Sequence, residues 1–282
     1  MGDFDFKVIN AEEEIQHIVD EIKKYFVKNG NENTKAVIGI SGGKDSTIAA
    51  ALLVRALGAE RVVGVMMPEF TQSDIHDSQE VCDILDIEAY TINIGATTEA
   101  LYKSLMPARI SANPKDVKIP AVVSTNTPAR IRMTTLYAVA ALVGGRVINT
   151  GNKSEAFVGY TTKYGDLAGD YAVLRDYYVT EIYKIGDALK LPTVLVYKAP
   201  SDGMSGKTDA DNMGFSYETL DDYLINGVVP EADVLKNILD RHARNRHKEA
   251  IRLPHPECRT RPYGGNTARH KYANDEDNPF NF

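Results

Sequence analysis

Short apolar runs alternate with longer segments of helical periodicity along the first half of the chain. The runs that predict strands are residues 36–40, 62–66, 89–94 and 146–149. The segments that predict helices are residues 45–57, 73–86, 96–105 and 128–143, and each is long enough to cross over to the next strand. This alternation predicts an α/β fold with a doubly wound parallel sheet flanked by helices, in which ligands bind at the carboxyl ends of the strands.

The remaining segments have weaker patterns. An opening helix is predicted after Asn10, because Glu13 follows three residues later as in a capped helix. Residues 107–127 and 199–214 carry Pro, Gly, Asn, Asp and Ser without periodicity, and we predict long loops there, the second of which would close over a ligand. We expect one domain over residues 1–282, with a polar tail from about residue 254 that is mobile.

Composition narrows the class of protein. With 43% hydrophobic and 25% charged residues over 282 positions, the chain resembles an ordinary globular protein. Its net charge of -7 gives no electrostatic reason to expect nucleic acid as a partner, and no apolar run is long enough to predict a membrane span. Cys82 and Cys258 are too few for a metal cluster, Cys82 fits a small buried thiol on a helix, and a reducing cytoplasm is the expected location.

The turn after the first predicted strand carries the strongest chemical signal. Residues 41–46 read Ser-Gly-Gly-Lys-Asp-Ser and open directly onto a predicted helix. Gly42 and Gly43 allow a sharp turn close to a ligand, and the first helix amides point at it unpaired, which favours a phosphate group. Asp45 stands where a Walker A loop requires Ser or Thr, and Ser41 stands where a dinucleotide motif requires glycine. A turn that only packs the helix on the strand is the alternative.

This loop resembles that of the ATP pyrophosphatases, which split ATP between its α and β phosphates. In that family the loop wraps the pyrophosphate, the hydroxyls of Ser41 and Ser46 add donors, and Asp45 holds magnesium. Further segments make the resemblance more specific. They are residues 126–133, 150–155, 163–170, 206–218 and 246–248. In order and spacing these segments resemble ammonia-dependent NAD synthetase over nearly the whole chain.

The resemblance implies that deamido-NAD is converted to NAD with ATP and ammonia, through an adenylated nicotinate carboxylate, with release of AMP and pyrophosphate. It implies that ATP is bound by Gly39, Ile40, Ser41, Gly42, Gly43, Lys44, Asp45, Ser46, Thr150 and Ser201. It implies that deamido-NAD is bound by Arg130, Lys163, Asp170, His247 and Lys248. Magnesium (Mg2+) would bind Asp45 and Glu155, since this ion prefers hard oxygen ligands. The resemblance also implies a homodimer, and it assigns no catalytic acid, base or nucleophile.

Several points stay open. The family commonly has Lys in a Tyr-Lys-Thr-Glu segment where this chain has Val179, so a cation near the ATP phosphates is missing, and Lys184 or Lys44 could replace it. The pair His247 and Lys248 also fits simple charge stabilisation at a helix C-terminus. Two other functions are a tRNA-modifying ATP pyrophosphatase, disfavoured by the acidic charge and the absence of cysteine pairs, and a nucleotide-binding module without turnover.

Overall fold

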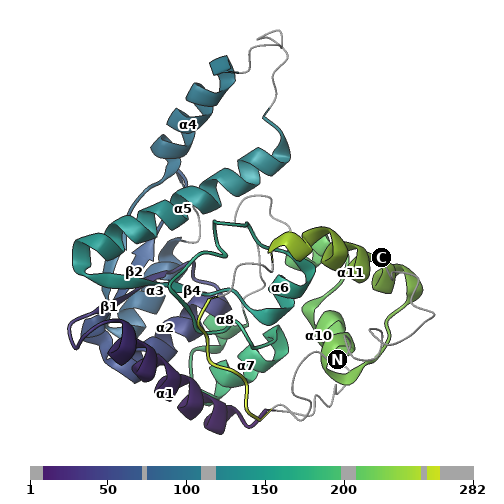
Figure 1. Ribbon diagram of the computed structural model, residues 1–282, viewed down its shortest axis with the longest axis horizontal. Helices are drawn as coiled ribbons and strands as arrows, with labels where there is room; N and C mark the ends of the chain where they lie inside the picture. The colour runs from purple at the N-terminus through teal and green to yellow at the C-terminus, as the bar shows by residue number, and fades with distance from the viewer. Residues whose placement is uncertain (1–8, 72–74, 109–118, 198–207, 249–252, 261–282) are drawn as a thin grey trace.

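A sheet of five parallel strands, in the order β3-β2-β1-β4-β5, lies at the centre of the part of the chain that is described (Figure 1). The computed structural model describes residues 9–71, 75–108, 119–197, 208–248 and 253–260. The strands are β1 (Lys35–Gly39), β2 (Val62–Met66), β3 (Glu88–Thr91), β4 (Gly145–Asn149) and β5 (Tyr171–Ala172). The parallel sheet and its first four strands are confirmed, whereas β5 is too short to leave a pattern in the sequence.

The helices surround this sheet. They are α1 (Ala11–Asn29), α2 (Lys44–Leu57), α3 (Ile75–Leu85), α4 (Gly95–Ala108), α5 (Ala121–Val143), α6 (Lys153–Val158), α7 (Val179–Ala188), α8 (Thr193–Val196), α9 (Asp209–Met213), α10 (Tyr217–Asn226) and α11 (Ala232–Asn245), with 3-10 turns at Ala59–Arg61 and Arg246–Lys248. The opening helix and those predicted at 45–57, 73–86 and 96–105 are confirmed. The helix predicted at 128–143 begins at residue 121 instead, with Pro120 at its N-cap position and Pro128 inside it. The loop predicted at 107–127 is therefore wrong over its last residues.

The two faces of the sheet are covered by different helices. On one face, Ala36 and Ile38 of β1 join an apolar core with α1, α2, α3, α7 and α8. On the other face, Val37 of β1 and Val147 of β4 pack against Val139 of α5. Since both faces are covered, β2 is buried along its whole length and carries no polar side chain, and this is why the sequence predicts it as a continuous run, whereas the edge strand β3 is mostly exposed.

A second apolar cluster joins α6, α7, α9, α10 and α11, and it contains Val179, whose side chain is fully buried. Part of the loop predicted at 199–214 belongs to this region as α9. The Thr208 hydroxyl accepts a hydrogen bond from the backbone N–H of Asp211, and the Asp211 carboxylate accepts one from the backbone N–H of Thr208. The loop prediction is therefore wrong over these residues, and residues 198–207 lie outside the described part.

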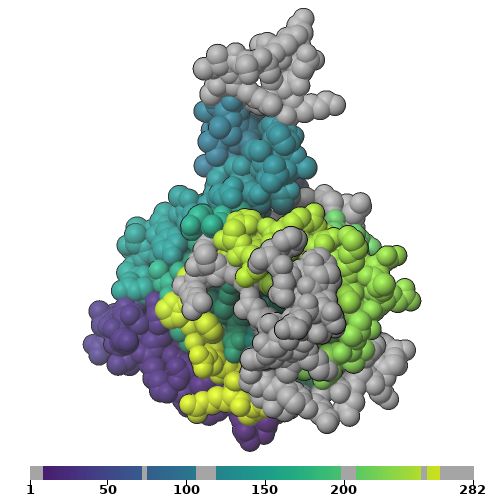
Figure 2. Space-filling model, turned by 45° about the vertical axis from the view of Figure 1, so that its right-hand side comes forward, coloured from purple at the N-terminus to yellow at the C-terminus, as the bar shows by residue number. Residues whose placement is uncertain are grey.

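The segment 253–260 runs past α1 and β5, as Figure 2 shows in yellow beside the purple helix. The backbone N–H of Ala172 donates to the carbonyl of Pro254, and those of Arg259 and Thr260 donate to the buried carboxylate of Glu14. These contacts hold the start of the tail in place, in contrast to the mobility expected from about residue 254. Residues 261–282 lie outside the described part of the chain.

The thiol of Cys82 is buried on α3, as predicted. None of the described helices combines the length and the apolar character needed to cross a bilayer.

Candidate functional site

The turn after β1 is held by hydrogen bonds among its own polar groups. Ser41 Oγ lies 3.1 Å from Ser46 Oγ, and the Ser46 hydroxyl donates to the carbonyl of Gly43 at 3.0 Å. Gly42 has a φ of 73°, which favours glycine, and a Cβ there would lie 2.8 Å from Cβ of Asp77 in α3. The loop therefore presents the N-terminus of α2 in a fixed backbone conformation, as a phosphate group requires.

The two predicted magnesium ligands meet at the carboxyl ends of β1 and β4, where the order of the strands reverses. Asp45 lies in the first turn of α2 and Glu155 in the first turn of α6. The side-chain amide of Asn152 donates to Asp45 Oδ1 at 3.3 Å, and its Oδ1 accepts from the backbone N–H of Glu155 at 2.9 Å. Asn152 was not predicted as a functional residue, although its Asn-x-x-Glu capping pattern is visible in the sequence.

The negative charges of Asp45 and Glu155 are only partly neutralised by nearby positive charge. Burial raises the pKa of Glu155, the charge of Asp45 raises it further, and Lys44 lowers it only in part. Lys44 donates from Nζ to Asp45 Oδ2 at 2.9 Å. Burial lowers the pKa of Lys44, but the carboxylates of Asp45 and Glu155 outweigh this effect and raise it. Two carboxylates therefore share one fixed cation, and a second cation would be stabilised there.

These residues fit a magnesium ion. Magnesium is commonly bound by one or two carboxylates together with water and substrate phosphates, and Asp45 keeps 19% of its side chain exposed beside the phosphate loop. Elsewhere in the described residues, His76, Asp77 and Glu80 of α3 also place three ligand atoms within 4.8 Å of one another. His76 and Glu80 are exposed, and exposed acidic groups often gather without a metal, so the acid pair remains the candidate site.

Three of the predicted deamido-NAD contacts gather around the loop of residues 159–166, which follows α6. Arg130 Nε on α5 donates to the carbonyl of Lys163 at 3.2 Å. Lys248 Nζ donates to two carbonyls of the same loop at 2.6 and 2.7 Å. The loop is fixed to the end of β4 by Asn149, whose side-chain amide donates to a loop carbonyl at 2.6 Å. These cations therefore lie next to the strand end that leads to the acid pair.

The other predicted site residues have more varied surroundings. Asp170 accepts hydrogen bonds from a backbone N–H of β4 at 2.8 Å and from the hydroxyl of Tyr137 at 3.3 Å. His247 is exposed on the 3-10 turn after α11, and Thr150 lies between β4 and α6. Ser201 lies outside the described residues. The observed partners of Asp170 belong to the protein itself, so the ligand roles of these residues stay predictions.

One buried carboxylate that the sequence did not single out supports the start of α6. Asp221 of α10 accepts a hydrogen bond from Ser154 Oγ at 2.5 Å and from the backbone N–H of Thr180 at 2.9 Å. Burial raises the pKa of Asp221 to about 7, against the lowering effect of these hydrogen bonds. Ser154 directly precedes Glu155, so the network fixes the helix turn that carries this acid. The partners of Asp221 are distant in sequence, and no local pattern could reveal them.

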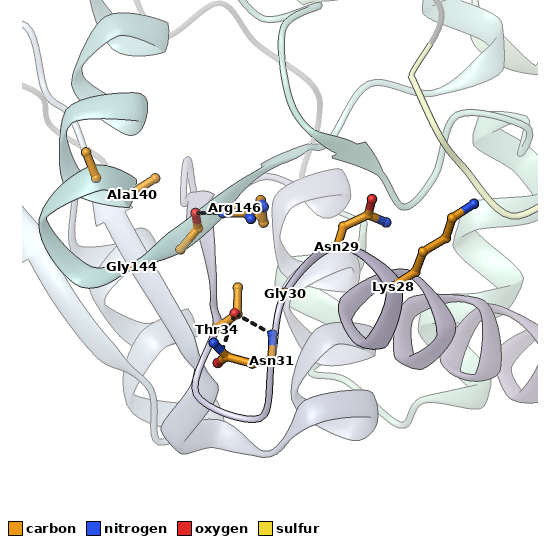
Figure 3. Close-up of a pocket in the computed structure, with 10 residues that line it drawn as sticks. Lys28, Asn29, Gly30, Asn31, Thr34, Ala140, Gly144 and Arg146 are labelled. Atoms are coloured by element: carbon orange, nitrogen blue, oxygen red, sulfur yellow. Dashed lines mark hydrogen bonds between the residues drawn. The ribbon is translucent and has the colours of Figure 1, made fainter.

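A hollow of about 690 Å³ lies at the opposite edge of the sheet (Figure 3). It is lined by the ends of α1 and α5, the turn before β1 and the start of β4, with Lys28 and Arg146 as its cations. Helix C-termini carry partial negative charge, which accounts for cations at this edge. Because ligands of open parallel sheets bind at the carboxyl ends of the strands, we do not assign the functional site to this hollow.

The fold and the loop define a nucleotide-binding α/β protein of the ATP pyrophosphatase type. The family model described as NAD synthase matches residues 14–252, and the chain belongs to this family. An NH(3)-dependent NAD(+) synthetase from Methanococcoides burtonii is 44% identical over 192 residues, which cover 67% of this chain and 70% of the relative.

Two solved structures are similar to this chain over most of its length. The structure of NMN synthetase from Francisella tularensis has a TM-score of 0.77 and 33% identity, and the match covers 86% of this chain and 98% of that chain. An NH3-dependent NAD synthetase from Campylobacter jejuni, in complex with the nitrate ion, has a TM-score of 0.67 and 28% identity, with coverage of 87% and 98%.

Proposed function

We propose that this chain catalyses the ATP-dependent amidation of deamido-NAD to NAD with ammonia, releasing AMP and pyrophosphate. Membership in the NAD synthase family and 44% identity with an NH(3)-dependent NAD(+) synthetase support this activity over a tRNA-modifying enzyme or a module without turnover. The observation that carries the proposal is the contact of Asp45 with Asn152, which caps the helix of Glu155. It joins two acids from separate strand ends beside a phosphate loop.

The reaction must activate a carboxylate, which resists attack by ammonia because it is negatively charged and has a poor leaving group. The nicotinate carboxylate attacks the α phosphorus of ATP, so a carboxyl–phosphate bond forms and pyrophosphate leaves. Amides at the start of α2 and the hydroxyls of Ser41 and Ser46 hold the departing pyrophosphate. Ammonia then attacks the activated carbonyl carbon, AMP leaves and a proton is released. The chain acts mainly by positioning and by neutralising charge.

The roles of the charged residues follow from this scheme. Asp45 and Glu155 would hold magnesium, which supplies neutralisation of phosphate charge when it is bound. Arg130, Lys163 and Lys248 supply cations for the pyrophosphate and the nicotinate carboxylate of deamido-NAD. The gathering of these three residues around one loop supports this division of the site.

The test is an assay of the purified chain with deamido-NAD, ATP, magnesium and ammonium, read by mass spectrometry. We expect NAD and AMP in equal amounts, and no NAD when ammonium is left out. Formation of AMP with another acceptor but not with deamido-NAD would contradict the proposed substrate. Binding of ATP without any formation of AMP would instead identify a nucleotide-binding module.

A second substrate is favoured by one comparison, because the structure with a TM-score of 0.77 is named NMN synthetase. The same amidation of nicotinate mononucleotide would yield NMN. Both substrates carry the reacting carboxylate, and they differ in the AMP half that deamido-NAD alone possesses. A competition assay with both substrates at equal concentration measures the ratio of their kcat/KM values. A ratio that favours the mononucleotide would replace deamido-NAD as the main substrate.

We also propose a homodimer in the cytoplasm. Helix α4 and the start of α5 stand out from the body of the protein (Figures 1 and 2). They expose large apolar side chains, including Leu101, Leu105 and Val122, which is 64% exposed, and such surfaces mark interaction sites. Sedimentation velocity is expected to show a dimer for the wild type and a monomer when Leu101 and Leu105 are both changed to Glu. Cys82 and Cys258 are not joined in a disulfide, which fits a reducing compartment.

A further inference from the structure

Lys44 is a buried lysine in the first turn of α2. Its side chain is 3% exposed, and its Nζ lies 5.9 Å from the ring centroid of Tyr183 and 5.4 Å from that of Tyr217. A buried ammonium is costly unless it is paired. Here Asp45 Oδ2 accepts a hydrogen bond from it at 2.9 Å, and two aromatic faces add cation–π attraction. The cation is therefore fixed in one place at the base of the phosphate loop.

This cation lies in the region that a lysine at residue 179 would enter. Val179 is fully buried in the apolar cluster that also contains Tyr217, one of the two rings beneath the Lys44 ammonium. Val179 and Tyr183 are four residues apart on α7 and therefore share one face of that helix. A lysine at residue 179 would therefore lie near the same two rings, those of Tyr183 and Tyr217, that contact the ammonium of Lys44.

Lys184 is the other cation considered from the sequence. It follows Tyr183 directly on α7, so its side chain leaves the helix about 100° away from the ring that borders the Lys44 ammonium. Lys44, in contrast, donates a hydrogen bond to Asp45 at 2.9 Å, and its charge lowers the pKa of Glu155. Geometry therefore favours Lys44.

We propose that Lys44 is the fixed cation of the ATP site, which holds Asp45 and Glu155 together and replaces a phosphate-site lysine at residue 179. The inference rests on the proposed function, because it assigns a role within ATP binding. Lys44 acts through the acid pair and is a positioning residue. Its loss is expected to weaken binding of Mg·ATP, and a lysine introduced at residue 179 is expected to restore that binding.

Isothermal titration calorimetry with Mg·ATP tests this role without relying on turnover. Lys44→Met keeps the apolar stem and removes the charge, and its Kd for Mg·ATP is expected to rise about 10- to 100-fold, the range of a charge-assisted contact. The double variant with Val179→Lys is expected to recover most of this loss. Val179→Lys alone adds a second cation to one buried cluster, so a lower melting temperature is expected. Lys184→Met is the matched control, with an unchanged Kd.

The outcomes separate the inference from the proposed function. A wild-type chain that fails to bind Mg·ATP contradicts the proposed function itself. A wild type that binds, with an equal Kd for Lys44→Met, overturns only the role of Lys44, as does a folded double variant that binds no better than Lys44→Met. If the double variant does not fold, Lys44→Arg decides: retained affinity supports a need for positive charge, and a loss as large as that of Lys44→Met refutes it.

Discussion

The two edges of the sheet differ in what they offer a ligand. At the carboxyl edge, Asp45, Asn152 and Glu155 meet beside a phosphate loop, at the N-termini of α2 and α6. At the amino edge, the ends of α1 and α5 border a hollow of about 690 Å³ that contains Lys28 and Arg146 (Figure 3). The carboxyl edge presents polar groups that are hydrogen-bonded to one another. The amino edge presents an open hollow lined by two cations.

The difference shows that strand direction, more than the size of a hollow, determines where the functional side chains lie in this fold. All strands are parallel, so every connection that follows a strand begins at the carboxyl edge, and helix N-termini converge there. Their unpaired amides attract phosphate and their partial positive charge stabilises acids nearby. Helix C-termini converge on the other edge and are matched by lysine and arginine. Substitutions at the two edges should therefore have unequal effects.

The largest effect is expected at the carboxyl edge for Asp45→Asn. The change removes a metal ligand and the negative charge that pairs with Lys44, with almost no change in the size of the side chain. We expect kcat for NAD formation to fall by at least about 100-fold, in line with the loss of one electrostatic contact to the transition state. The melting temperature should also fall, because the buried ammonium of Lys44 loses its charged partner, so the kinetics are compared on protein that circular dichroism shows to be folded. Glu32→Gln, an exposed acid away from the loop, is the matched control, and near-normal turnover of Asp45→Asn at saturating magnesium would refute the metal site.

A smaller effect is expected from Asp221→Asn, which tests the support beneath the same edge. Burial holds the pKa of Asp221 at about 7 in the folded chain, above its usual value of 3.8, so its contribution to stability is full below pH 4 and lost as pH rises through 7. Between pH 5 and pH 8 this loss is about 2 to 3 kcal/mol.

Denaturant unfolding of both proteins at these two pH values checks the prediction. The asparagine variant lacks the titrating carboxylate, so its free energy of unfolding should fall less between pH 5 and pH 8 than that of the wild type. Equal falls in the two proteins would show that Asp221 does not titrate in this range.

Arg130→Ala tests the cationic group that lies outside the phosphate loop. Arg130 is exposed and contacts the loop of residues 159–166 through one hydrogen bond, so the fold should tolerate the change. We expect the KM for deamido-NAD to rise about tenfold, with the KM for ATP nearly unchanged, because a charge-assisted contact to one substrate is lost. Arg244→Ala, an exposed arginine on α11, is the control. A parallel rise in both KM values would place Arg130 in a general structural role.

The sequence predicted these regions to different degrees for physical reasons. The loop of residues 41–46 and the first four strands were predicted because their signals are local: a Gly-Gly turn and continuous apolar runs. The pairing of Asp45 with Glu155 was implied by the family resemblance; Asn152, which contacts Asp45 and the backbone N–H of Glu155, brings the two segments together, and their role as metal ligands stays a prediction. Asp221 could not be predicted, because its partners lie on α6 and α7, far along the chain.

Two further misses have local causes. The buried position of Val179 depends on the packing of α7 against α10, which periodicity alone does not specify. The early start of α5 was missed because a proline inside a helix is read as its boundary. Local sequence patterns thus predicted the loop of residues 41–46, whereas the side chains that pack around it depend on contacts between residues distant in sequence.

The smallest effect is expected at the amino edge, for Arg146→Ala. Arg146 lines the hollow in Figure 3, and its Nη1 donates to the carbonyl of Gly145 at 3.1 Å. Loss of this single hydrogen bond should lower the free energy of unfolding by about 1 kcal/mol or less, since water can replace the donor. Both KM values should stay within about twofold of the wild type, because no catalytic contact is removed. Steady-state kinetics with each substrate varied in turn provides the measurement. A tenfold change in either KM would mean that the hollow is energetically coupled to the proposed ligand site. Strand direction alone would then not explain where this fold binds its ligands.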